Sequence, residues 1–171
     1  MLTPAQEGYL ATVREERIAH IHPFDPETQM TAQEIIGEVK SDHPNTEIYY
    51  IGSSKLGIAG ENDIDLSIFV GKDFEDCLSR LARRYGEPTH RSRKSNYVNW
   101  EFIRNGFPIE LHLGDFVDAG FKEQLATQKI LENDGKLRKE YEKLKLQCDG
   151  LPWKEYLIKK YEFWNRILGL K

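Results

Sequence analysis

Four short stretches of the chain have the residue pattern of β-strands. Residues 47–51 and 64–70 are rich in β-branched and aromatic side chains, and residues 107–113 alternate between apolar and polar positions. Residues 96–103 place three large apolar side chains on one face. We therefore predict a small sheet of four strands that buries one face of these residues in a core.

Most of the remaining chain has the apolar spacing of helices. Prolines and glycines interrupt this spacing at Pro23–Pro26 and at Gly150–Pro152, and Thr31 and Glu34 are spaced as a capping box. The predicted helices cover residues 4–20, 31–40, 73–85, 119–149 and 153–168.

Together these elements predict an α+β fold in one domain. The expected architecture is a small mixed β-sheet with helices packed on one face and a C-terminal helical pair. Its 171 residues are enough for one compact core. Within a single domain of residues 1–171, we expect N-terminal helices in 1–45, the sheet core in 46–118 and a C-terminal helical extension in 119–171.

The composition is that of a protein that folds in water. Hydrophobic residues make up 39% of the chain and the mean hydropathy is −0.61. No stretch approaches the ~20 apolar residues that span a bilayer, and the N-terminus lacks a secretory signal, so we expect a cytoplasmic protein without membrane contact. Cys77 and Cys148 have no motif spacing and are expected to be reduced structural residues.

Charge is distributed unevenly along the chain. The formal net charge is −4, with +4 in residues 121–171 and −8 in residues 1–120. With a pI near 5.8, the chain lacks the excess of positive charge that is typical of bulk nucleic-acid binders. The basic residues 90–94 form either a solvated loop or a group, including Arg93, that neutralises a triphosphate or a charged acceptor.

The segment between the first two predicted strands has the composition of an anion-binding turn. Gly52, Gly57 and Gly60 allow positive φ and a close approach of the backbone to a ligand. Consecutive N–H groups in such a turn can form a nest for an anion. We predict that phosphate groups are bound by four consecutive residues: Gly52, Ser53, Ser54 and Lys55.

Carboxylates follow this turn on the predicted strands. Asp63 and Asp65 share one strand face because they are two residues apart, and Glu110 lies with His112 on the polar face of a later strand. Three carboxylates can hold two divalent cations in a phosphoryl-transfer site. We therefore predict metal ligation and catalysis by Asp63, Asp65 and Glu110, with Glu101 as the alternative third acid.

The order of these residues resembles the nucleotidyltransferase superfamily, which includes DNA polymerase β, poly(A) polymerases and aminoglycoside nucleotidyltransferases. That superfamily has Gly-Ser-X-X-X-Gly, then Asp-X-Asp, then a single acid on a later strand. The chain is more closely similar to the GrpB-like family within it, from about residue 46 to the end. The resemblance is carried by Ile51–Ser54, Asp63–Leu66, Glu110–Leu113, Tyr141–Lys145 and Tyr156–Phe163.

Two positions depart from the GrpB-like pattern. Leu56 precedes Gly57 where the family usually has proline, and Glu110 stands where the family's strand usually begins with histidine. The second difference gives this chain all three acids of the wider superfamily. It favours an active site over a degenerate one.

The resemblance implies a nucleotidyltransferase-like fold and metal-dependent transfer of an NMP group from an NTP to a hydroxyl or phosphate acceptor. Mg²⁺ or Mn²⁺ would be the cofactor. In related folds the C-terminal helices close over the nucleotide, so Lys145 and Lys160 are candidate substrate contacts, together with His112 and Arg93. The acceptor, the base preference and the oligomeric state stay open.

Two other functions are compatible with these residues. One is a nucleotide-binding or regulatory module on the same fold without turnover. Loss of catalysis would remove the need for the three acids, yet all three are present. The other is an antitoxin-like or RNA-modifying partner protein that docks through its basic tail. The chain is longer than a minimal partner domain needs to be.

Overall fold

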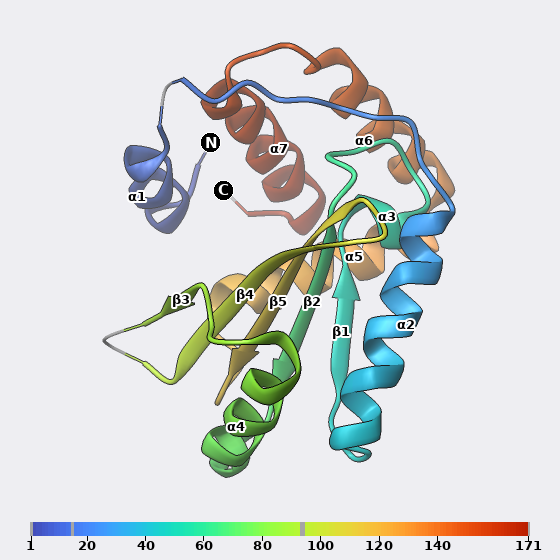
Figure 1. Cartoon of the computed structure of the whole chain (residues 1–171). Helices are drawn as coiled ribbons and strands as arrows, with labels where there is room; N and C mark the ends of the chain where they lie inside the picture. The colour runs from blue at the N-terminus through green and yellow to red at the C-terminus, as the bar shows by residue number, and fades with distance from the viewer. Residues whose placement is uncertain (1, 15, 93–94, 171) are drawn as a thin grey trace.

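Five strands form one mixed β-sheet in the computed structural model, which describes residues 2–14, 16–92 and 95–170 (Figure 1). The strand order is β1-β2-β5-β4-β3, in which β2 and β5 run parallel and the other neighbours antiparallel. The four predicted strands are confirmed, and a two-residue strand is added where a loop was one expectation. The strands are β1 (Ile48–Ile51), β2 (Ile64–Phe69), β3 (His90–Arg91), β4 (Tyr97–Arg104) and β5 (Phe107–Gly114).

Helices precede, interrupt and follow the strands. No helix in the described part of the chain is long and apolar enough to cross a membrane. The helices are α1 (Pro4–Thr12), α2 (Glu27–Asp42), α3 (Ser53–Leu56), the 3₁₀ helix η1 (Gly71–Asp73), α4 (Phe74–Tyr85), α5 (Ala119–Asn133), α6 (Gly135–Gln147) and α7 (Trp153–Leu168).

Three helices differ from the predicted ones. The first ends at Thr12 instead of near residue 20. The second begins before Thr31, which is therefore a buried residue inside α2 and not its cap. The predicted helix over residues 119–149 is split at Asp134, whose carboxylate accepts hydrogen bonds from two backbone N–H groups of α6 and so caps a new helix.

Helices cover both faces of the sheet, so the expectation of helices on one face is wrong. On one face, α2 and α4 enclose the main core with the buried isoleucines and leucines of β2 and β5. On the other face, Phe121 of α5 packs against Tyr49 and Phe69, with ring centroids 5.6 and 4.9 Å apart. The rings of Tyr49 and Phe69 make part of the second face apolar, and α5 packs on this part. Figure 1 shows α2 and α4 in front of the sheet and α5 behind it.

Residues 17–22 are extended and run beside the C-terminal helical region. The Ala19 N–H donates to the carbonyl of Leu151 at 2.9 Å. The N–H groups of His22 and Gly60 donate to each other's carbonyl at 2.7 and 3.0 Å. These backbone hydrogen bonds replace the predicted helix, and they tie the N-terminal segment both to the break before α7 and to the turn after α3.

The two cysteines are free and buried, as expected of structural thiols. Cys77 belongs to the core beneath α4, where burial raises the pKa of its thiol to about 11. Cys148 ends α6 and packs with the buried residues of the C-terminal region. Neither thiol belongs to the acid group described below.

Candidate active site

Asp63, Asp65 and Glu110 meet on the α5 side of the sheet. Asp65 of β2 is paired with Glu110 of β5 in the parallel register, and Asp63 immediately precedes β2. One carboxylate oxygen of each lies within 4.8 Å of the others. The intervening Ile64 and the following Leu66 are fully buried on the opposite face. Carboxylate oxygens grouped in this way are suited to hard divalent cations.

Burial and mutual repulsion perturb the ionisation of the two aspartates. Burial raises the pKa of Asp65 well above its usual range, and the charges of Asp63 and Glu110 raise it further. Burial and the charge of Glu61 raise the pKa of Asp63. Ionising these groups together is therefore unfavourable until a cation binds, and such coupled shifts are characteristic of functional sites.

Glu110 is shifted in the opposite direction by His112. Their hydrogen bond lowers the pKa of Glu110 and outweighs the effect of burial. His112 Nε2 lies 3.5 Å from Glu110 Oε2, while His112 Nδ1 lies 2.6 Å from the hydroxyl oxygen of Tyr97. Tyr97 therefore orients the imidazole of His112 toward Glu110, and this contact with His112 keeps the Glu110 carboxylate ionised. The candidate substrate contact His112 thus lies directly beside the third acid.

The predicted phosphate-binding turn lies beside the acids. Gly52 directly follows β1 and has a φ of +92°, in the left-handed region that favours glycine. A Cβ atom on Gly52 would lie 2.9 Å from Oδ2 of Asp65, so only glycine allows this close approach. Ser53 and Ser54 are buried, and Ser53 lines the cleft that contains the acids. Lys55 is exposed and does not belong to the residues that line this cleft.

The N–H of Gly52 already has an acceptor. It donates to Oε1 of Gln128 on α5 at 3.1 Å, and Gln128 Nε2 donates to Oε1 of Glu132 at 3.1 Å. A side-chain carbonyl oxygen therefore occupies the position that was predicted for a phosphate oxygen. Phosphate binding to this N–H requires Gln128 to move away.

Gly60 contributes to the same turn through close packing. Its φ is not in the positive range, but a Cβ atom built on it would lie 2.3 Å from Cβ of Ser53. The turn after α3 and the phosphate-binding residues are thus packed against each other at a position that has no room for a side chain.

Gly60→Ala is expected to destabilise the protein by about 1–3 kcal/mol, because the backbone must shift to accommodate the methyl group. Urea unfolding measures this change. Gly37→Ala is the matched control, since a Cβ atom on this helical glycine meets nothing within 4 Å. A Gly60→Ala protein as stable as Gly37→Ala would contradict the packing described for this turn.

A buried ion network connects the turn after α3 to the C-terminal helices. Lys145 of α6 is 1% exposed, and its Nζ lies 2.5 Å from Oε2 of Glu61 and 2.7 Å from the hydroxyl oxygen of Tyr156. Tyr156 of α7 donates to the other oxygen of Glu61, and Lys160 Nζ lies 3.8 Å from that same oxygen. Glu61 is therefore held by three side chains.

Glu61 was not predicted from the sequence, although it lies two residues before Asp63. Burial alone would raise the pKa of Glu61, but the charges of Lys145 and Lys160, and the hydrogen bonds that Glu61 accepts from Lys145 and Tyr156, outweigh burial and hold this pKa well below its usual range. The sequence did contain a signal for this role of Glu61. The residue lies between the glycine turn and the Asp-X-Asp segment, and the tail carries the lysines that pair with it.

The two candidate lysines of the tail have different surroundings. Lys145 is almost completely buried and directed at Glu61, whereas the Lys160 side chain is 21% exposed. Burial opposes the charge of Lys160, but Tyr141, Glu61 and Asp65 outweigh it and raise its pKa. Lys160 therefore remains positively charged near the acids. The remaining candidate, Arg93, lies outside the described residues.

One cleft of about 710 Å³ is lined by the three acids together with Glu61, His112, Lys145 and Lys160. Its walls come from the sheet, α5, α6, α7 and the N-terminal segment, and they include the aromatic rings of Tyr97, Phe121 and Trp153. A cleft of this size, lined by both aromatic rings and charged side chains, has room for a small polar ligand. Tyr141 also reaches this cleft, but it is 3% exposed and stacks on Phe163, as expected of a core residue.

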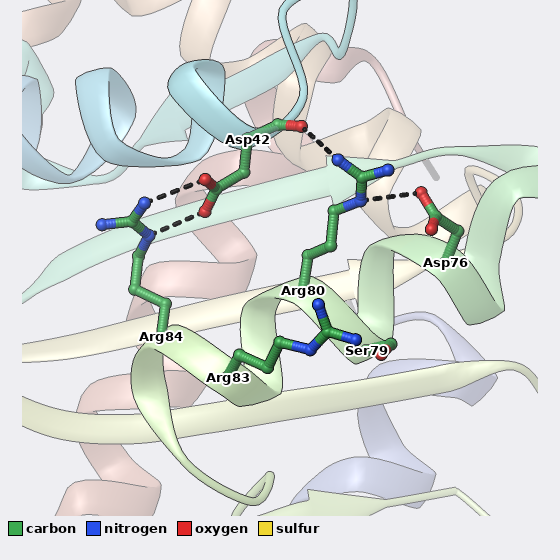
Figure 2. Close-up of a pocket in the computed structure, with 6 residues that line it drawn as sticks. All are labelled: Asp42, Asp76, Ser79, Arg80, Arg83 and Arg84. Atoms are coloured by element: carbon green, nitrogen blue, oxygen red, sulfur yellow. Dashed lines mark hydrogen bonds and ion pairs between the residues drawn. The ribbon is translucent and has the colours of Figure 1, made fainter.

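A second hollow, between α2 and α4, has a different character (Figure 2). Arg84 donates two hydrogen bonds of 2.8 and 2.9 Å to the carboxylate of Asp42, and Arg80 pairs with Asp76 at 3.0 Å. Its residues are distinct from those that line the acid cleft. Because most of its charge is paired internally, this surface is explained by one ion pair between the two helices, Arg84–Asp42, and one within α4, Arg80–Asp76.

The fold is similar to that of the nucleotidyltransferases. A solved structure of the Cid1 poly(U) polymerase with MgGTP bound aligns with a TM-score of 0.51 and 14% identity. The alignment covers 71% of this chain and 41% of that chain. At this identity the likeness establishes the fold, in agreement with the predicted fold class.

This chain belongs to the GrpB protein family, whose model matches residues 18–169. The solved GrpB structure from Enterococcus faecalis aligns with a TM-score of 0.64 and 20% identity, covering 86% of this chain and 99% of that one. A UPF0157 protein of Vibrio cholerae is 26% identical over 145 residues, which cover 77% of this chain and 71% of that protein. The predicted family is therefore confirmed.

Proposed function

We propose that this protein is a metal-dependent nucleotidyltransferase that moves an NMP group from an NTP to a hydroxyl or phosphate acceptor. The observation that carries the proposal is the grouping of Asp63, Asp65 and Glu110 within 4.8 Å in a cleft of about 710 Å³. The fold supports it, since the Cid1 polymerase that shares this fold has MgGTP bound.

Asp63 and Asp65 would hold two Mg²⁺ or Mn²⁺ ions. Glu110 would be a further ligand of the ion on the side of the acceptor. Three clustered carboxylates are a suitable donor set for these cations. Bound ions would polarise the phosphoryl oxygens and lower the pKa of the attacking hydroxyl. Glu110, whose own pKa lies below its usual range, stays ionised and can accept the hydroxyl proton. The acceptor oxygen then bonds to the α-phosphorus while the bond to the bridging oxygen breaks, and pyrophosphate leaves.

The turn after β1 would bind the β- and γ-phosphates through Gly52, Ser53 and Ser54, whereas Lys55, which lies outside the lining of the cleft, could reach them only from its rim. Binding at Gly52 would displace the oxygen of Gln128 that now accepts its N–H. Lys160 is better suited than Lys145 to contact the triphosphate, because Lys145 is enclosed by Glu61 and Tyr156. Lys160 would act as a point charge beside the phosphates.

NTP binding is expected to raise the melting temperature in the presence of Mg²⁺ or Mn²⁺. At a ligand concentration 100-fold above Kd, binding adds about 2.7 kcal/mol. For a protein of this size, that corresponds to an increase of roughly 5–10 °C. Thermal-shift measurements with each NTP, with either metal and with EDTA, test this expectation. If no NTP stabilised the protein with either metal, the nucleotide site would be wrong.

A nucleotide-binding module without turnover is the alternative on the same fold. It gives the same metal-dependent thermal shift but releases no pyrophosphate. The two are therefore separated by measuring pyrophosphate release in the same samples, with hydroxyl and phosphate compounds supplied as acceptors.

A further inference from the structure

Arg17 lines the acid cleft at a position that is fixed by backbone hydrogen bonds. Its carbonyl accepts the N–H of Trp153, the first residue of α7, at 2.7 Å. The next residue, Ile18, forms an antiparallel bridge with Pro152. The extended segment that replaced the predicted helix therefore anchors Arg17 to the start of α7.

The guanidinium of Arg17 is held by an aromatic ring. Its Cζ lies 3.7 Å from the ring centroid of Trp153, in cation–π contact. A stacked guanidinium keeps the N–H donors at its edge available for a ligand. Within residues 2–14, 16–92 and 95–170, the Arg17 side chain has no hydrogen-bond or ion-pair partner.

The other basic side chains of the described cleft are already compensated. Lys145 forms its ion pair with Glu61 at 2.5 Å, and Lys160 lies 3.8 Å from the same carboxylate. Arg17 has no such carboxylate partner, although it is exposed and faces the same cleft. It is therefore ready to pair with an anion that enters from solution.

Arg17 lines the same cleft as the three acids and Lys160. Lys160 and the turn after β1 are assigned above to the triphosphate, and Lys145 is enclosed by Glu61 and Tyr156. Among the arginines and lysines of the described cleft, Arg17 is therefore the one left for the acceptor.

We propose that Arg17 binds an anionic group, a phosphate monoester or a carboxylate, on the acceptor that carries the attacking hydroxyl. The planar fork of a guanidinium matches two oxygens of either group. The acceptor is thus a small hydroxylated compound with a negatively charged end. The acceptor role rests on the proposed nucleotidyl transfer. Arg17 precedes the segment matched by the family model, so the family match does not imply this contact.

The first test is calorimetric titration of the full chain with three probes: glycerol, glycerol 3-phosphate and glycerate. They share hydroxyl groups and differ in the anionic end. We expect the wild type to bind at least one anionic probe, and Arg17→Gln to weaken that binding about 10- to 100-fold, as for loss of a charge-assisted hydrogen-bonded pair. The better anionic probe identifies the group. Equal affinity in wild type and Arg17→Gln, or no binding by wild type, would overturn the proposal.

Two further variants separate a binding role from a structural one. Arg14→Gln removes a nearby exposed arginine that does not line the cleft, and it should bind the probes like wild type. Arg17→Lys keeps the charge without the fork and should recover only part of the affinity. Equal losses in Arg14→Gln and Arg17→Gln would overturn the proposal, since general charge would then explain the effect. Titrations without NTP keep this test independent of the proposed nucleotide binding.

Discussion

Asp65→Asn is expected to abolish Mg²⁺-dependent nucleotidyl transfer while leaving the protein folded. Asp65 contributes one of three carboxylate oxygens that lie within 4.8 Å of one another. Removing one ligand should cost about 4 kcal/mol of transition-state stabilisation, which lowers kcat about 10³-fold. The measurement is pyrophosphate release from NTP in the presence of Mg²⁺ and hydroxyl or phosphate acceptors.

The same substitution is expected to raise the melting temperature in metal-free buffer at neutral pH. The pKa of Asp65 is raised in the folded state by burial and then by Asp63 and Glu110. The stability contributed by its protonated form is therefore present below the unfolded-state pKa and is lost as the pH rises through the folded-state pKa. Asparagine carries no charge and avoids this loss. Melting curves in EDTA at acidic and neutral pH test the sign.

Glu101→Gln is the matched control for this site. Glu101 of β4 is paired with Glu110 in the antiparallel register, but it lies outside the group of three acids. We expect Glu101→Gln to retain transfer and Glu110→Gln to lose it as Asp65→Asn does. Unchanged turnover in purified Asp65→Asn would remove this site from consideration.

The grouping of the three acids could be anticipated because strand periodicity is a local property. Ile64 and Leu66 are buried opposite Asp63 and Asp65, as the alternation of side chains in a strand requires. The sequence could not establish that β2 and β5 are neighbours, because strand order depends on contacts between distant segments. That pairing brings Glu110 directly beside Asp65.

The parts that were not anticipated depend on such distant contacts. Glu61 is bound by Lys145 and Tyr156, which follow it by 84 and 95 residues. The helix predicted over residues 4–20 includes residues 17–20, yet backbone hydrogen bonds to Leu151 and Gly60 hold residues 17–22 extended. Tertiary pairing overrides local propensity at this segment. The phosphate-binding roles of Gly52 through Lys55 stay predictions.

Lys145→Met is expected to destabilise the protein by about 3–5 kcal/mol, because it leaves the Glu61 carboxylate without its closest cation. Glu61 is only 12% exposed, so water cannot replace the lost interaction fully. For a chain of this length, the loss corresponds to a fall in melting temperature of roughly 10 °C. Urea unfolding and thermal melts measure the change.

Lys143→Met is the control for Lys145→Met, because Lys143 is exposed on the same helix. The surface substitution should change stability by less than about 0.5 kcal/mol. The double variant Glu61→Gln/Lys145→Met removes both charges and should recover part of the stability, since the uncompensated carboxylate is the main cost. Equal stability of the Lys145→Met and Lys143→Met proteins would show that the network does not stabilise the fold. A double variant no more stable than Lys145→Met would assign the loss to packing around the lysine stem instead of to the carboxylate of Glu61.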